Sequence, residues 1–142
     1  MNAMVTSTHP ARLLRRRRVP LPAGPPAAST ARAEVLAAVS AWHVPVDPHV
    51  AALLTSELVT NAIQHEDDPG VMLAIKSCSG QLRVDVYDTS HAMPAPTNPP
   101  ADAESGRGLI LVAALADEWG YYGTPEGKAV YFSLGFSHQS MR

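Results

Sequence analysis

Residues 47–65 read DPHVAALLTSELVTNAIQH, a stretch that carries both a helix and the signal for its start. Asp47 suits the N-cap, where its carboxylate accepts backbone N–H groups, and Pro48 suits the first helical position. Apolar residues recur along the stretch at helical spacing, so we expect one helix from Pro48 to His65. Acidic residues and Pro69-Gly70 follow, which predicts a turn at its end.

Two polar residues of this helix border the face that it must bury. The helix carries one i, i+4 ridge of Leu53, Glu57, Asn61 and His65, next to an apolar ridge that begins at Val50. An ionised carboxylate at the edge of a core costs free energy unless it is paired, solvated in a cleft or used. Chance alignment of a surface glutamate and a boundary asparagine would give the same pattern. From this helix alone, that explanation is at least as good as a functional site.

The elements around this helix follow from periodicity and turn residues. We expect a second helix from Ser29 or Thr30 to Trp42, a third at 108–116, and strands at 71–77, 81–88, 119–122 and 129–134. Residues 89–105 are rich in proline and form a loop of a length that is often functional. This order predicts an α+β fold, a two-layer sandwich with helices on one face of a mixed, mostly antiparallel sheet.

The charge of the chain is unevenly distributed. The 142 residues suit one domain, and a hydrophobic fraction of 46% is enough for a core. Residues 1–33 hold six arginines and no acid, a charge of +6, whereas residues 34–142 hold five cations and 13 acids, a charge of −8. We therefore expect a basic, Pro-rich, partly disordered segment at 1–28, a folded domain at 29–136 and a tail at 137–142, with an edge strand at Arg17 to Leu21 as an alternative.

Several classes of protein are excluded or disfavoured by composition. The single cysteine, Cys78, excludes an internal disulfide and a Cys-rich zinc site, and we expect it half-buried at a strand end. No apolar run approaches the length of about 20 residues that spans a membrane. The Pro-rich run after Arg18 is unlike the apolar core of an export signal, so we expect a cytoplasmic protein. The histidines are scattered, which disfavours metal catalysis without a nucleotide.

A carboxylate also interrupts an apolar face at the end of a strand. In residues 81–88 the alternation puts Asp88 on the face of Leu82, Val84 and Val86. Three polar or aromatic residues, Arg83, Asp85 and Tyr87, point the other way. Asp88 could cap the backbone at the start of the following loop. A buried acceptor there would also suit recognition of an amino group on a planar ligand.

After the ridge of Glu57 and Asn61 and the strand end at Asp88, a third segment departs from the apolar pattern. It is a helix start marked by two glycines, Ser105-Gly106-Arg107-Gly108-Leu109. Glycines at a helix start let free backbone N–H groups approach an anion, and the helix dipole favours phosphate there. Alone, the motif is more typical of a flexible helix entry, because it lacks the third glycine of the dinucleotide fingerprint and the lysine of a P-loop. One nucleotide pocket would explain all three departures, whereas separate explanations require three coincidences.

Together the three segments resemble the boxes of the ATPase superfamily shared by gyrase, the ninety-kilodalton heat-shock chaperone, histidine kinases and mismatch-repair proteins. Residues 57–65 resemble its N-box, residues 84–90 its first glycine box and residues 105–109 its second. The compact length and the Glu-Leu-Val-Thr-Asn-Ala run of residues 57–62 are similar to bacterial anti-sigma-factor serine/threonine kinases. The resemblance covers residues 29–136 and implies an ATP-binding fold of the Bergerat type.

The resemblance implies a role for each matching residue. Glu57 would be the general base, and Asn61 would bind the Mg²⁺ that bridges the ATP phosphates. Asp88 would accept a hydrogen bond from the adenine amino group. His65 would lie near the phosphates, or would simply be a cation at the helix C-terminus. The second glycine box, Gly106, Arg107, Gly108 and Leu109, would receive the phosphates, and residues 89–105 would form a lid over ATP.

Two positions depart from the superfamily pattern. Ser90 replaces the glycine of the first glycine box, and it is small enough to leave space for adenine. The superfamily often has a threonine near the last strand that helps hold adenine, and Gly127-Lys128-Ala129 offers none. We therefore expect adenine recognition to depend on water or on Ser90.

The resemblance implies a regulatory protein that transfers the γ-phosphate of ATP to a serine or threonine of an antagonist and controls transcription through a sigma factor. Related kinases suggest a homodimer. The alternative is a nucleotide-dependent protein-binding module without kinase activity. Specific nucleic-acid binding by Arg15 to Arg18 is disfavoured, because the run has no interleaved aromatic residues and the acidic body repels a nucleic-acid backbone.

Overall fold

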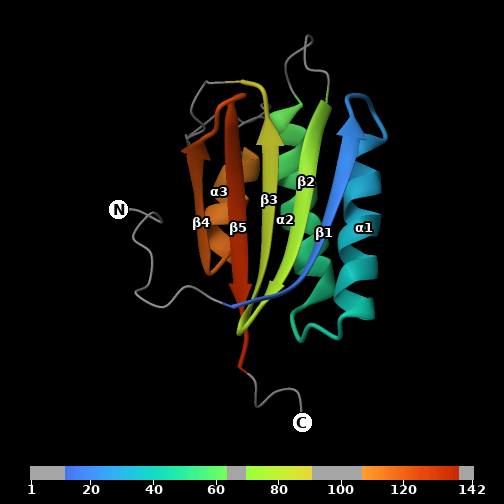
Figure 1. Ribbon diagram of the computed structural model, residues 1–142, viewed down its shortest axis with the longest axis vertical. Helices are drawn as coiled ribbons and strands as arrows, with labels where there is room; N and C mark the ends of the chain where they lie inside the picture. Colours follow the sequence, from blue (N-terminus) through green and yellow to red (C-terminus); the bar gives the residue numbers. More distant parts are fainter. Residues whose placement is uncertain (1–11, 64–69, 91–106, 138–142) are drawn as a thin grey trace.

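The computed structural model describes residues 12–63, 70–90 and 107–137, except for the side chain of Arg107. These ranges contain five strands and three helices (Figure 1). In chain order they are β1 (Leu13–Pro22), α1 (Ala27–Ala41), α2 (Pro48–Ala62), β2 (Gly70–Cys78), β3 (Gln81–Asp88), α3 (Arg107–Leu115), β4 (Glu118–Gly123) and β5 (Lys128–Gly135). No helix within the described ranges has both the length and the apolar character needed to cross a membrane.

The strands form one sheet in the order β1-β2-β3-β5-β4. Every described strand pair is antiparallel, so the sheet is not mixed. The three helices cover one face of the sheet and leave the other face without a helix (Figure 1). The predicted α+β sandwich is therefore confirmed, and we call its two sheet surfaces the helix-covered face and the open face.

The core lies between the helices and the helix-covered face. Strand alternation directs Leu73 and Ile75 of β2 into it, and both are fully buried. Phe132 of β5 and Leu54 of α2 are equally buried. Burial of each such side chain stabilises the fold by about 1.5–3 kcal/mol. This core fixes the spacing between α2, which carries Glu57 and Asn61, and the sheet, which carries Asp88.

The start of α2 confirms the sequence prediction. The Asp47 carboxylate accepts hydrogen bonds from the backbone N–H groups of His49 and Val50, at 2.9 and 3.3 Å, and Pro48 is the first helical residue. The helix ends at Ala62, with Ile63 at the C-cap, so the predicted end at His65 is wrong by three residues. His65 itself lies outside the described residues.

The start of α1 differs from the prediction. The helix begins at Ala27 with Pro26 at the N-cap, and the Ser29 hydroxyl donates to the Pro26 carbonyl at 3.0 Å. The predicted cap at Ser29 or Thr30 is therefore wrong. Proline fixes φ near the helical value, so the Pro25-Pro26 pair starts the helix without a side-chain cap.

The arginine run forms an edge strand. β1 pairs with β2 in a register that places Arg17 opposite Ile75. Arg17 faces α1, where its guanidinium lies 3.4 Å from a Glu34 oxygen and 5.5 Å from the centre of the Trp42 ring. The alternative of a strand at Arg17 to Leu21 is confirmed, and the strand is longer than predicted. Part of the segment at 1–28 thus belongs to the sheet, while residues 1–11 lie outside the described ranges.

Candidate active site

Glu57 of α2 contacts the first turn of α3. A Cβ atom added to Gly108 would lie 2.7 Å from Glu57 Oε1 and 3.3 Å from Glu57 Cβ. Only a residue without a side chain fits here unless the carboxylate moves. The N-box and the second glycine box, about 50 residues apart in the sequence, therefore meet in space, with a carboxylate against the start of a helix.

Asn61 follows Glu57 on the same side of α2, four residues along the helix. Both residues are half-buried, as their position beside the apolar ridge predicts. Leu53 of the same ridge is 38% exposed, whereas Leu54 and Leu58 on the neighbouring ridge are buried. The ridge of Glu57 and Asn61 thus lies at the boundary of the core, where a polar side chain can be reached by a ligand.

Asp88 lies at the end of β3 on the helix-covered face, as the alternation predicts. Its side chain is fully buried. Lys128, its partner across β3 and β5, places Nζ 3.1 Å from Oδ1 and 3.0 Å from Oδ2. The Ser90 backbone N–H donates to Oδ1 at 2.8 Å. The carboxylate predicted to recognise adenine is therefore held by a cation and a backbone donor.

Lys128 is a site residue that the sequence analysis does not identify. It pairs with Asp88. A signal was present in the sequence, because Lys128 shares its strand face with Val130, Phe132 and Leu134, where an apolar residue would be expected. A lysine at such a position needs a buried partner.

Gly127 holds the start of β5 close to the end of β3. A Cβ atom at Gly127 would clash with the Asp88 carbonyl oxygen and would lie 2.6 Å from Thr89 Cα. The Gly127 backbone N–H also donates to Thr124 Oγ1 at 3.0 Å, which fixes the turn before β5. This close approach places Lys128 opposite Asp88.

The remaining predicted residues are placed only in part. His65 and Gly106 lie outside the described residues, as do the Arg107 side chain and most of the predicted lid. Leu109 is 2% exposed and packs in the core. Its backbone, rather than its side chain, is what can face a phosphate.

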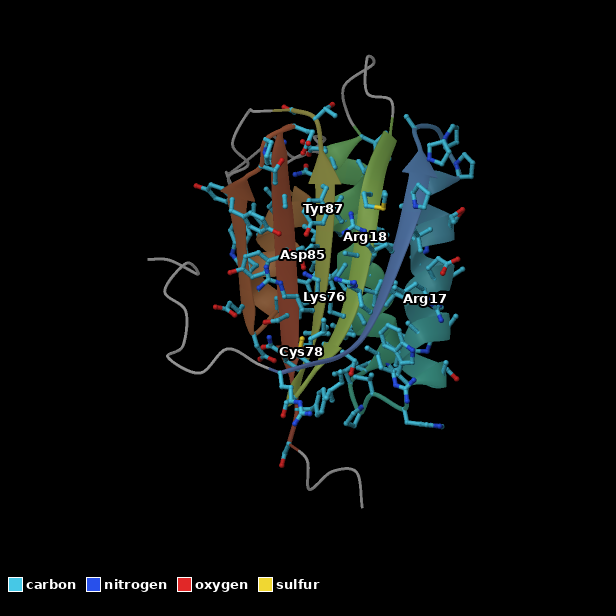
Figure 2. All side chains as sticks on the ribbon, viewed as in Figure 1. Arg17, Arg18, Lys76, Cys78, Asp85 and Tyr87 are labelled. Atoms are coloured by element: carbon cyan, nitrogen blue, oxygen red, sulfur yellow. The ribbon has the colours of Figure 1, made fainter. Side chains whose placement is uncertain are left out.

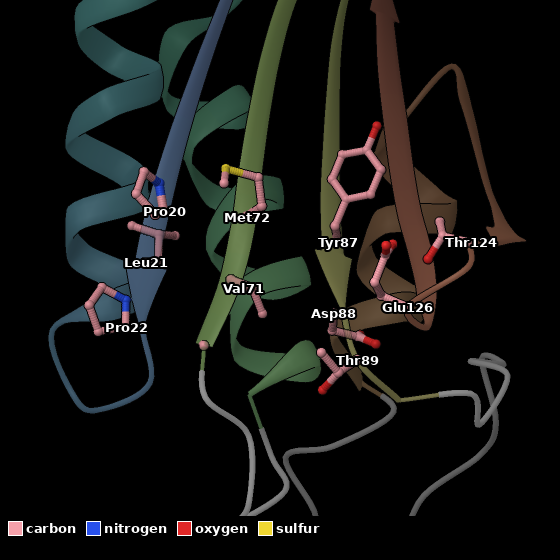
Figure 3. A pocket seen from close by; sticks show the side chains of 11 residues that line it. Pro20, Leu21, Pro22, Val71, Met72, Tyr87, Asp88, Thr89, Thr124 and Glu126 are labelled. Atoms are coloured by element: carbon pink, nitrogen blue, oxygen red, sulfur yellow. The ribbon is translucent and has the colours of Figure 1, made fainter.

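An open pocket of about 370 Å³ lies at the same end of the sheet as Asp88 (Figure 3). Its walls include Pro20, Met72 and Tyr87, which form a row across β1, β2 and β3 on the open face. The pocket touches the candidate site at Asp88 but opens on the other side of the sheet from Glu57. It does not bring the three boxes together.

The open face carries a second buried carboxylate, Asp85. Arg83 donates to it from Nε and Nη2, both at 2.9 Å, and the Tyr122 hydroxyl donates at 2.9 Å. Lys76 Nζ lies 3.6 Å away, and Figure 2 shows this lysine and Asp85 on neighbouring strands. The sequence predicted the face of Asp85 correctly, but not its complete burial.

The surroundings of Asp85 shift the titration of its partners. Burial opposes the charge of Arg83, but the hydrogen bonds and charge of Asp85 outweigh it and raise the pKa of the guanidinium. Burial, followed by the hydrogen bond with Tyr87, raises the pKa of Tyr122 above its usual range. Cys78, predicted to be half-buried, is 6% exposed at the end of β2, and burial raises the pKa of its thiol.

Among the described residues, no three His, Cys, Asp or Glu side chains lie close enough to hold a metal ion by themselves. Asn61, the residue predicted to bind Mg²⁺, is half-buried on α2. An amide oxygen is a suitable ligand for Mg²⁺, which usually keeps few protein ligands and binds phosphate oxygens as well.

Comparison with known proteins identifies the family. A model of the histidine kinase-like ATPase domain matches residues 21–134. No curated protein sequence matches the chain. The crystal structure of the RsbU and RsbW domains of Rv1364c from Mycobacterium tuberculosis is similar, with a TM-score of 0.64 and 20% identity over 86% of this chain and 32% of that one. The chain thus spans about a third of that protein, and the likeness shows a shared fold. The chain belongs to the family of histidine kinase-like ATPase domains, which bind ATP.

Proposed function

We propose that this protein binds Mg·ATP and transfers the γ-phosphate to a serine or threonine of an antagonist protein, as an anti-sigma-factor kinase does. The observation that carries the proposal is the contact between Glu57 and Gly108. It places a candidate general base beside the first turn of a helix, where free backbone N–H groups favour phosphate. A base and a phosphate-binding site are the two parts that phosphoryl transfer to a hydroxyl requires.

Each residue of the site has a part in this proposal. The Glu57 carboxylate accepts the proton of the attacking hydroxyl as the new oxygen–phosphorus bond forms, while the bond between the γ-phosphorus and the bridging oxygen breaks and ADP leaves. The backbone at the start of α3, from Arg107 to Leu109, receives the phosphate in this proposal. Asn61, one turn of α2 beyond Glu57, holds Mg²⁺, which neutralises phosphate charge when bound. The Asp88–Lys128 pair holds the base at the far end of the site.

The regulatory role is supported by the solved structure that shares this fold. That protein is described as containing RsbU and RsbW domains. We infer that this chain likewise acts on protein partners, namely a sigma factor, an antagonist of its own binding, or both. Binding of either partner would be coupled to the nucleotide state.

Transfer of radiolabelled γ-phosphate tests the kinase proposal. Wild type is incubated with labelled Mg·ATP and candidate antagonist proteins, each with its acceptor serine or threonine intact or changed to alanine. We expect label on the intact antagonist only, and its loss in the Glu57→Gln variant. Glu34→Gln, the same change on the half-buried surface of α1, is the matched control and keeps the activity.

Three outcomes would each contradict a different part of the proposal. A Glu57→Gln variant that still transfers phosphate at the wild-type rate would sink the mechanism. Nucleotide binding by wild type without transfer to any candidate would favour the protein-binding module over the kinase. Absence of ATP binding would contradict both.

A further inference from the structure

The open face carries a row of cations across three neighbouring strands. Arg16 of β1 lies opposite Lys76 of β2, and Lys76 lies opposite Arg83 of β3. Strand alternation directs Arg18 to the same face, where its guanidinium lies 5.9 Å from the centre of the Tyr87 ring. We call these four cations the basic patch. Like charges directly opposite each other destabilise a sheet, so the row costs stability unless anions offset it.

One carboxylate offsets only part of this charge. Arg83 donates two hydrogen bonds to Asp85, and Lys76 Nζ lies 3.6 Å from the same carboxylate. Within the described ranges, the exposed side chains of Arg16 and Arg18 form no ion pair. Four cations and one buried carboxylate thus leave a local charge of +3 on a chain whose net charge is −2. An anion from outside the chain would find two cations available.

The pocket described above lies beside the basic patch on the same face (Figure 3). Pro20, which lines the pocket, is two residues from Arg18 and four residues from Arg16 along β1. Met72 and Tyr87 continue the pocket wall across β2 and β3. At the rise of about 3.3 Å per residue in a strand, the wall lies about 7 Å from one arginine and about 13 Å from the other. One short segment can therefore reach both the apolar pocket and the cations.

This combination fits an acidic protein segment better than a nucleic acid. The Tyr87 ring already has Arg18 over it and the Tyr122 ring edge-on at 6.4 Å, so it is not free to stack with a base. Glu126 lines the pocket, and Glu118 of β4 continues the row beyond the basic patch. Both would repel a continuous run of phosphates. A protein segment instead supplies carboxylates for the patch and an apolar side chain for the pocket.

We propose that the open face is a docking surface for an acidic segment of a protein partner. Carboxylates of the segment lie against Arg16 and Arg18, and one apolar side chain enters the pocket beside Met72. Complementary charge of this kind gives specificity and fast association. The surface lies on the other side of the sheet from Glu57, so a partner can dock without covering the candidate active site. The inference therefore does not depend on the proposed nucleotide binding.

Fluorescence anisotropy of labelled peptides with the full chain tests the proposal. The probe is an extended peptide that carries one leucine and a glutamate two and four residues from it, made in both chain directions. One comparison peptide has glutamine in place of each glutamate, and another has alanine in place of leucine. We expect the probe to bind about fivefold more tightly than the glutamine peptide at low salt, since two exposed ion pairs form. The difference should decrease as salt is raised.

Three variants locate the binding surface. Arg16→Ser/Arg18→Ser removes the two exposed cations of the basic patch and should lower the affinity for the probe about fivefold. Arg12→Ser/Arg15→Ser removes the same charge from exposed arginines outside the patch, so it is the matched control and should bind the probe as wild type does. Met72→Gln places a polar group in the pocket wall and should reduce the loss of affinity caused by the leucine-to-alanine change in the peptide.

Several outcomes would overturn the proposal. It fails if the glutamine peptide binds as tightly as the probe, or if the two double variants bind the probe equally. A single-stranded oligonucleotide of the same charge that binds as tightly as the probe would assign the surface to nucleic acid. A dimer in analytical ultracentrifugation that excludes the probe and is dissociated by Arg16→Ser/Arg18→Ser would assign it to a second copy of the chain. Each of these results leaves the proposed nucleotide binding intact, because Arg16→Ser/Arg18→Ser should bind ATP as wild type does.

Discussion

Asp85 and Asp88 lie three residues apart in β3 and on opposite faces of the sheet, and both side chains are completely buried. Asp85 accepts three hydrogen bonds, two from Arg83 and one from Tyr122, and Lys76 Nζ lies 3.6 Å from it. Within the described ranges Asp88 also accepts three, two from Lys128 and one from the Ser90 backbone N–H. Neither burial nor the number of hydrogen bonds therefore marks a ligand site by itself; the face of the sheet distinguishes the two carboxylates.

Asp85 and Asp88 also have different roles in the fold. Asp85 organises the open face, where the Arg83 guanidinium stacks 3.9 Å from the centre of the Tyr131 ring. Long side chains cover the strands there in place of a helix. Asp88 instead lies at the end of β3 on the helix-covered face, where it pairs with Lys128 of β5. The comparison predicts that changes around Asp85 on the open face affect stability, and changes on the helix-covered face affect nucleotide binding or catalysis.

Asp85→Ala should give the largest effect on stability. It leaves the buried part of Arg83 without its carboxylate and the Tyr122 hydroxyl without its acceptor. Loss of one partner of a buried ion pair costs about 3–5 kcal/mol. We expect a fall of that order in the free energy of unfolding, measured by urea denaturation, with the ATP affinity of the folded fraction unchanged. A large loss of ATP affinity would contradict the prediction that changes around Asp85 on the open face affect stability and not nucleotide binding.

Gly108→Ala should reduce phosphoryl transfer with little effect on stability. The added Cβ meets the free end of the Glu57 side chain, which can rotate away. Displacement of a catalytic group by about 1 Å can cost about a hundredfold in rate. We expect a loss of that order in the transfer assay at nearly constant urea midpoint. An unchanged rate would show that Glu57 is not placed by this contact.

Tyr122→Phe should have a moderate effect. It removes one hydrogen bond to Asp85 and the weaker contact with the Tyr87 hydroxyl at 3.2 Å, but leaves the two bonds of Arg83. Such a bond contributes about 1 kcal/mol, so we expect a decrease of that size in unfolding free energy at neutral pH. Tyr121→Phe, a change of an exposed tyrosine in the same strand, is the control. Equal effects in the two variants would contradict the role of Asp85 as the centre of the open face.

The smallest effect concerns alkaline pH. Burial and the hydrogen bond with Tyr87 raise the pKa of Tyr122 above the usual value of about 10. Its contribution to stability is thus fully present below pH 10 and is lost as pH rises further, when the unfolded chain gives up the phenolic proton first. The difference in free energy of unfolding between wild type and Tyr122→Phe should therefore decrease above pH 10, as measured by urea denaturation at a series of pH values. A constant difference would exclude this linkage.

The sequence predicted most local features of the fold correctly. Asp47 caps α2 because the cap is a local hydrogen-bonding pattern, and β3 has the expected bounds because its apolar residues alternate. Two features depended on distant residues. The arginine run is a strand because β2 supplies its ladder. Lys128 meets Asp88 because of a register between strands that are 40 residues apart in the chain.

In the candidate site, too, the features that depend on one element were predicted, and those that join distant residues were not. The sequence placed Asp88 on the correct face and Glu57 at the core boundary, because each follows from the period of one element. The contact between Glu57 and Gly108 joins two helices and needed the packed structure. Burial of Asp85 also needed it, because its cover comes from the β4 residue Tyr122.

The arginines of β1 have a consequence for assembly. β1 ends the sheet order, so the backbone groups on its outer side can pair with another strand. Two copies meeting antiparallel along this edge, in the register centred between Arg16 and Arg17, would set arginine opposite arginine over the run from Arg15 to Arg18. Like charges placed directly across a ladder repel. The same run that gives this chain its basic end therefore opposes growth of the sheet by self-addition in that register.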